Sequence, residues 1–385
     1  MQGRLKSLAG ALVVLLVVAT SVTYELRKND KWTPDGFLYA RMMLVDTGMT
    51  EADAHAAASR FYLTTRAARD PHERTFYAAQ GPAFFEAQYP LFRGRPLYPW
   101  LAAQFYPRIG FVALKVVAAL GAVLAAAAAY RLFLLFAPWW LAACGAIATV
   151  SPAAIGDAPV LALTDGLALG WWTVALAAIA VYARRPTRTA LAIAVVAAAL
   201  LALTRPAIWL PIGAAAGFLV AARLAGDPAR RRGALIMLLA QLAVAAAAVA
   251  YTAAIHGANV ATLTQWAYAW QTAEHGWFVE RGIAGWYLLL ILRDIVYEPA
   301  LLVLRGLPVL GVAAAAIGFA KRRRDPVVAV LLGAACAAPL AVVLNPIDVA
   351  RALELPLVPV VMAGVVAALS AALRAPANAD LLQQR

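Results

Sequence analysis

The sequence predicts an all-α polytopic membrane protein, and three observations support this prediction. The chain has 385 residues, of which 64% are hydrophobic and only 14% are charged. Soluble domains are nearer half apolar and a quarter charged. The mean hydropathy of +0.74 reflects long apolar runs, and a helix needs about 20 such residues to cross a bilayer. No run alternates with the period of two that a membrane β-barrel requires.

A single membrane domain covering residues 1–385 is expected, with about ten transmembrane helices. The first run has a short basic lead but no clear cleavage site, so we interpret it as a retained signal-anchor helix. The expected helices lie at residues 8–24, 109–133, 139–155, 164–183, 190–203, 206–222, 234–254, 299–320, 327–344 and 352–373.

Two longer polar segments interrupt these runs. Residues 25–95 are interpreted as a long first extracytoplasmic loop carrying amphipathic helices, and residues 256–298 as a second extracytoplasmic segment. In the first loop, Thr50 and Asp53 have the spacing of a capping box, which predicts a helix start. The second segment is rich in tryptophan, which is common at the membrane interface.

The charge distribution predicts the orientation of the chain. A net charge of +13 by itself would suit a nucleic-acid binder, but the cations gather in short loops between apolar runs, which indicates the cytoplasmic side. The N-terminus is therefore expected in the cytoplasm, with the chain in the inner (plasma) membrane and no nucleic-acid partner. Cys144 and Cys336 fall within apolar runs and are expected to be small core residues rather than a disulfide, and their spacing is not that of a metal site.

Asp35 lies a few residues beyond the opening apolar run, on the opposite, extracytoplasmic side. Pro34 and Gly36 restrict the backbone around it, and Tyr39 shares its face if a helix starts here. A carboxylate held at the membrane surface suits a general base or a cation ligand. The alternative is that Asp35 only caps the following helix.

Arginines on the same side are candidates to bind a phosphate. Arg205 lies between two apolar runs with no loop, where a charge is costly without a partner or an anion, and its planar fork suits phosphate. The alternatives are snorkelling to the interface or pairing with Asp165. Arg351 is a similar candidate, with pairing to Asp348 as its alternative. At the start of the helix at 164–183, Thr164 or Asp165 is expected to be the cap, and the alternative for Asp165 is a second acid across a cleft from Asp35.

Two separated acids and one or two arginines suit one reaction, in which an acceptor hydroxyl is deprotonated and a sugar leaves a lipid-linked phosphate. Lys115 and Arg305 are buried-cation candidates that either hold this phosphate or form structural pairs. The remaining candidates to line the substrate cleft are Tyr39, Arg95, Tyr98, Asp157 and His275.

Five short motifs resemble the GT-C superfamily of integral-membrane glycosyltransferases, which includes protein O-mannosyltransferases and the lipid A aminoarabinose transferase. The motifs are Asp35-Gly36-Phe37-Leu38-Tyr39, Arg95-Pro96-Leu97-Tyr98-Pro99, Leu163-Thr164-Asp165-Gly166-Leu167-Ala168-Leu169, Leu203-Thr204-Arg205-Pro206 and the turn at 345–351.

The resemblance implies a catalytic role for Asp35 and a polyprenyl-phosphate sugar donor used on the extracytoplasmic face. The acceptor would be a lipid, a glycan or a protein. Several members of that family have two adjacent acids in the first loop, whereas Asp35 here is flanked by Pro34 and Gly36. The need for a divalent cation therefore stays open.

Two other classes of function are compatible with the sequence. A transporter or lipid flippase usually has repeats and binds its substrate at the mid-membrane through broken helices. Gly306 and Pro308 interrupt one expected helix, but no repeat is evident and the polar residues gather on one face. A non-catalytic assembly partner in envelope synthesis is the third possibility, and its acids would tolerate replacement.

Overall fold

The structure, a computed structural model, describes residues 2–28, 31–63, 89–156, 158–257, 307–340 and 355–374. These ranges form 14 helices and contain no strand, which confirms the all-α prediction. Five of the helices are long and apolar enough to cross a membrane: α1 (Gln2–Lys28), α6 (Val112–Phe133), α9 (Asp165–Arg184), α12 (Pro228–Ala254) and α19 (Leu355–Arg374). They indicate a multi-pass membrane protein.

Five further apolar helices are shorter: α7 (Trp139–Thr149), α10 (Arg188–Thr204), α11 (Trp209–Leu224), α16 (Leu307–Lys321) and α17 (Pro326–Ala337). Together with the five long helices they occupy the positions of the ten expected runs. Whether the shorter helices also cross the bilayer stays a prediction. The expected helix at 139–155 is divided in two, since α7 ends at Thr149 and a separate turn, α8 (Pro152–Ile155), follows it. The physical reason is that Pro152 lacks the amide hydrogen that a continuous helix needs.

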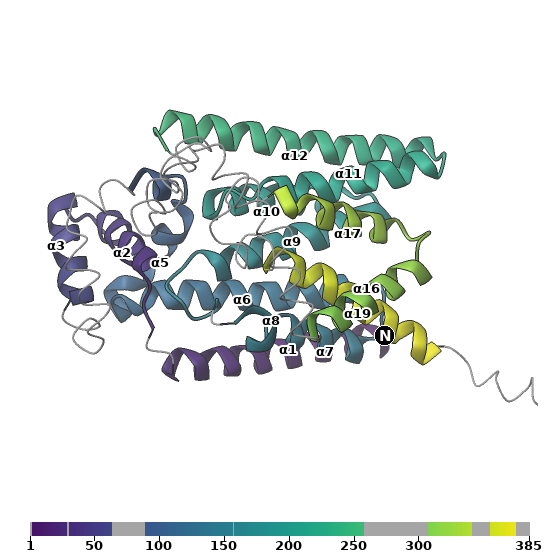
Figure 1. Cartoon of the computed structure of the whole chain (residues 1–385), viewed down its shortest axis with the longest axis horizontal. Helices are drawn as coiled ribbons and strands as arrows, with labels where there is room; N and C mark the ends of the chain where they lie inside the picture. The colour runs from purple at the N-terminus through teal and green to yellow at the C-terminus, as the bar shows by residue number, and fades with distance from the viewer. Residues whose placement is uncertain are drawn as a thin grey trace, which may run out of the picture.

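The long helices run along the longest axis of the molecule, with α1 and α12 at opposite edges and α6 and α9 between them (Figure 1). Burial agrees with this arrangement, since 83% of the apolar stretch of α9 and 67% of that of α6 are buried, against 22% for α1 and for α12. The free cysteines Cys144 and Cys336 are exposed on the bundle, so the expectation that they are core residues is wrong.

Glycines bring the backbones of α6 and α9 into contact. A Cβ added to Gly166 would lie 2.4 Å from the carbonyl oxygen of Ala118, and one on Gly121 would lie 2.3 Å from the carbonyl oxygen of Gly166. Small residues allow such close approach between helices in membranes, where packing rather than the hydrophobic effect holds helices together. The start of α9 is therefore fixed directly against α6.

Three helices, α2 (Pro34–Asp46), α3 (Glu51–Phe61) and α5 (Leu97–Ile109), gather at one end of the bundle (Figure 1). We call this the aromatic end, because its core includes the buried rings of Trp32, Phe37, Tyr39, Tyr62 and Tyr98. The opposite end, where α1 begins and the loop 322–325 joins α16 to α17, is called the basic end.

The predicted start of the first-loop helix is confirmed. Thr50 is the N-cap of α3, and its hydroxyl accepts a hydrogen bond from the backbone N–H of Asp53 at 3.2 Å. The same hydroxyl donates to the Asp53 carboxylate at 2.7 Å. Ala54 and Ala58 are buried, and α3 packs against α2, so the helix covers the aromatic end.

Candidate functional site

Asp165 and Arg205 form a buried ion pair at the aromatic end. Asp165 is the first residue of α9, where the positive end of the helix dipole favours a carboxylate. Arg205 follows the last residue of α10 and donates from Nη1 to Asp165 Oδ1. Their side chains are only 3% and 18% exposed. The pairing alternative for Arg205 is thus confirmed, while its role as a phosphate ligand stays a prediction.

A second set of polar contacts, centred on Tyr39, lies at the residue that precedes Asp165. Its hydroxyl accepts a hydrogen bond from Arg95 Nη1 at 3.0 Å and donates one to Thr164 Oγ1 at 3.5 Å. Thr164 is 2% exposed and directly precedes Asp165. Two predicted site residues from the first loop, Tyr39 and Arg95, therefore contact the segment that carries the buried acid.

Tyr98 packs edge-to-face against Tyr39, with ring centroids 5.1 Å apart. Its hydroxyl donates to the backbone carbonyl of Leu114 at 2.8 Å. Burial and the neighbouring Tyr39 hold the pKa of Tyr98 well above its usual range, so the hydroxyl keeps its proton and remains a donor. Tyr98 thus anchors the Tyr39 ring from a fully buried position; whether it also lines a substrate cleft is untested.

Asp35 lies in the first turn of α2, and its neighbour packs against the segment that leads into α9. The N-cap of α2 is Thr33, whose hydroxyl accepts from the backbone N–H of Gly36 at 3.3 Å. The alternative in which Asp35 caps the helix is therefore wrong. A Cβ added to Gly36 would lie 3.2 Å from the carbonyl oxygen of Ala162. Asp35 and Asp165 are consequently carried by two segments that touch.

Lys115, a predicted buried cation, is 4% exposed in α6. Its Nζ lies 4.6 Å from the ring centroid of Trp32, in the range of a cation–π contact. Trp32 is three residues before Asp35, so a cation and an acid lie near the same turn of the chain. Arg305, the other predicted buried cation, lies outside the described residues.

The sequence analysis gave no role to Arg41, which is 3% exposed within the aromatic end. Its Nη2 lies 2.5 Å from Glu51 Oε2, and its guanidinium lies 4.7 Å from the ring centroid of Tyr89. One signal was available: Arg41 follows Phe37 by one helical turn, inside an apolar stretch. The pair joins the start of α3 to the middle of α2 and holds the two helices together.

Several predicted site residues cannot be placed. Asp157, His275 and Arg351 lie outside the described residues, as does nearly all of the segment 256–298. Within the described ranges no group of three or more His, Cys, Asp or Glu side chains is arranged to hold a metal ion. The question of a divalent cation therefore stays open.

Comparisons with protein-family models, characterised proteins and solved structures found no match to this chain. The fold and the geometry thus define a class, a multi-pass helical membrane protein with a buried acid–arginine pair beneath an aromatic helical layer. Any more particular assignment is a proposal.

Proposed function

We propose that the chain is an integral-membrane glycosyltransferase that moves a sugar from a polyprenyl-phosphate donor to an acceptor on the extracytoplasmic face. The aromatic end would face that side. The observation that supports the proposal best is the buried Asp165–Arg205 pair, linked through Thr164 to Tyr39 and Arg95. Buried ion pairs are costly to desolvate and are weak evidence for stability, while ionisable groups inside membrane bundles usually mark functional sites.

In the proposed reaction Asp35 takes the proton of an acceptor hydroxyl. The hydroxyl oxygen attacks the anomeric carbon, and the bond between that carbon and the phosphate oxygen breaks. The polyprenyl phosphate leaves with the electron pair and with the growing negative charge, which Arg205 and Arg351 stabilise. Asp165 acts as the second acid of the site by fixing the guanidinium of Arg205.

The first test is transfer by membranes that contain the chain and labelled polyprenyl-phosphate sugars, followed by detection of label on the acceptor. Asp35→Asn should abolish transfer while the protein still inserts and folds. Asp46→Asn is the matched control, because Asp46 is an exposed acid in the last turn of the same helix. Full activity of Asp35→Asn would show that Asp35 is not the general base.

The same membranes distinguish the proposal from the transporter or flippase alternative. A transferase leaves label covalently attached to an acceptor and releases the polyprenyl phosphate. A transporter moves label across sealed vesicles without covalent transfer, and a flippase changes the leaflet in which an intact labelled lipid lies. Either of these two results without transfer would overturn the proposal.

A further inference from the structure

A cavity of about 480 Å³ lies at the basic end, far along the bundle from the candidate active site. It is formed by the loop that joins α16 to α17. Its lining consists of Ala320, Lys321, Arg322, Arg323, Arg324 and Asp325. Four consecutive cations therefore surround one small hollow, and the side chains of Lys321, Arg323 and Arg324 are exposed to a ligand.

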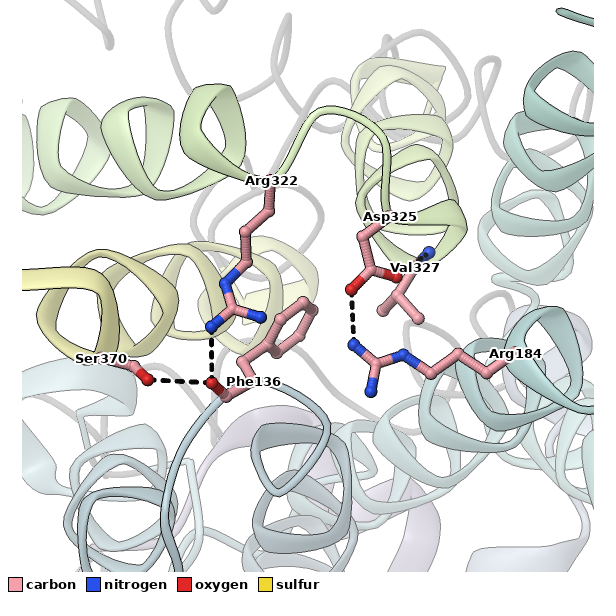
Figure 2. Close-up of polar contacts among 6 residues, drawn as sticks. All are labelled: Phe136, Arg184, Arg322, Asp325, Val327 and Ser370. Carbon is pink, nitrogen blue, oxygen red and sulfur yellow. Dashed lines mark hydrogen bonds and ion pairs between the residues drawn. The ribbon is translucent and has the colours of Figure 1, made fainter. Parts of the chain in front are cut away.

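The acid in this lining is already engaged. Asp325 Oδ2 accepts from Arg184 Nη2 at 2.5 Å, and Asp325 Oδ1 accepts from the backbone N–H of Val327 at 3.1 Å, which caps α17. Figure 2 shows the contact of the Asp325 carboxylate with Arg184. Both oxygens of the Asp325 carboxylate are thus hydrogen-bonded within the fold, and the cavity lining keeps a large excess of positive charge.

Arg322 anchors the loop to the rest of the bundle. Its Nη2 donates to the backbone carbonyl of Phe136 at 2.8 Å, and Ser370 donates to the same carbonyl at 2.9 Å (Figure 2). The guanidinium groups of Arg322 and Arg184 lie 5.5 and 5.7 Å from the Phe136 ring centroid. Burial and the nearby positive charge of Arg374 lower the pKa of Arg322, against the opposing effect of Asp325. The loop is therefore preorganised and short of negative charge.

An exposed apolar stripe leads to the cavity along α16. Leu310 and Ile317 are 67% and 54% exposed, and they share one helical face with Lys321 because positions i, i+7 and i+11 align. This face continues from the apolar span to the cation at its end. A lipid matches this arrangement, because its acyl chain can lie along the stripe and its charged headgroup at the loop. A soluble phosphate would not contact the stripe.

We propose that this cavity binds the phosphate headgroup of an anionic phospholipid. Arginine forks and lysine ammonium groups are the side chains that recognise phosphate, and basic pockets between helices at a membrane surface bind lipid headgroups. The basic end is the end that the positive loops assign to the cytoplasm. This inference does not depend on the proposed glycosyltransferase activity.

The experiment compares thermal unfolding of the full chain in phosphatidylcholine nanodiscs with and without phosphatidylglycerol. The variant Arg323→Gln/Arg324→Gln removes two exposed cations of the cavity. The control Arg231→Gln/Arg232→Gln removes two exposed arginines from α12 outside it. Phosphatidylglycerol is expected to raise the Tm of the wild type by several degrees, and the cavity variant should lose at least half of this rise while the control keeps it.

Three results would overturn the proposal. Equal Tm rises in the cavity variant and the control would mean that net charge, not the cavity, attracts the lipid. An equal rise on adding inorganic phosphate or glycerol phosphate to phosphatidylcholine nanodiscs would mean that the site takes a soluble anion. If the cavity variant has a lower Tm in phosphatidylcholine alone, native mass spectrometry of Lys321→Gln provides a second measurement, because it counts retained phosphatidylglycerol. Unchanged lipid retention in that variant would also contradict the proposal.

Discussion

The two ends of the bundle each contain an arginine–aspartate pair, and the two pairs differ in their exposure to water. At the aromatic end the side chains of Asp165 and Arg205 are 3% and 18% exposed. At the basic end those of Asp325 and Arg184 are 17% and 32% exposed. Both aspartates lie at the N-terminal end of a helix, where the dipole favours a carboxylate, but only Asp325 is the N-cap of its helix, since Thr164 precedes Asp165 at the cap position of α9. The difference lies in solvation and in what surrounds each pair.

This difference separates a structural pair from a candidate functional pair. The basic-end pair holds a loop against the bundle and remains partly hydrated. Its desolvation cost is therefore small, and so is its contribution to the free energy of unfolding. The aromatic-end pair is largely removed from water, and Thr164, the residue before Asp165, contacts a hydroxyl and a guanidinium group from two other segments through Tyr39 and Arg95. Four predictions sharpen or break this comparison, in order of decreasing effect.

The largest effect is expected for Asp165→Asn. Removing one charge leaves that of Arg205 buried without its aspartate, and breaking such a pair costs about 3–5 kcal/mol. Asp325→Asn should cost about 1 kcal/mol or less, because asparagine still caps α17 and the lost pair is partly exposed. Unfolding in detergent micelles measures both values. Equal losses at the two ends would refute the comparison.

Gly166→Ala should cost about 1–3 kcal/mol, because the added methyl overpacks a backbone-to-backbone contact. Its Cβ would lie 2.4 Å from the carbonyl oxygen of Ala118. The control is Gly3→Ala in α1, where an added Cβ meets no heavy atom of the described chain within 4 Å. Thermal unfolding should show a lower Tm for the first variant and no decrease for the second.

Tyr39→Phe removes the hydroxyl between Arg95 and Thr164 but keeps the ring that packs on Tyr98. The expected loss of stability is about 1–2 kcal/mol, because two hydrogen bonds are lost, one of them from a charged guanidinium. If the aromatic end is the active site, transfer should fall by much more than this stability change explains. Tyr251→Phe, at a 36% exposed position on α12, is the control. Unchanged transfer in Tyr39→Phe would separate this network from catalysis.

The smallest expected effect is that of ionic strength on the coupling energy of each ion pair. A double-mutant cycle on Arg184 and Asp325 should show a coupling energy of a few tenths of a kcal/mol that decreases as ionic strength rises, because exposed charges are screened. The corresponding cycle on Asp165 and Arg205 should change little with salt. Equal salt dependence of the two cycles would contradict the difference in burial.

The sequence predicts the helices of this fold well, because the length and composition of an apolar run largely determine where a membrane helix lies. It also places Asp165 at the start of its helix and raises its pairing with Arg205. The start of α2 was assigned less well. The Thr33-Pro34 order already indicates an N-cap followed by proline at the first helical position, yet Asp35 was considered as the cap.

The contacts between distant segments could not be predicted from the sequence. Tyr39 and Thr164 are 125 residues apart, and no local pattern indicates that their hydroxyl groups meet. The same holds for Lys115 and Trp32, because a cation–π contact requires no particular spacing along the chain. The roles of Asp35, Asp165 and Arg205 in a reaction stay predictions, since chemistry depends on a bound substrate as well as on position.

The glycine contact between α6 and α9 has a mechanical consequence for the aromatic end. Where two main chains touch, no side-chain rotation can let the helices slide past each other. Asp165, the residue before Gly166, is therefore held in place relative to α6. Any relative movement at the aromatic end is therefore expected in α2, α3 and α5 rather than between α6 and α9. Asp35, on α2, would take part in such a movement, while Asp165 stays with α6.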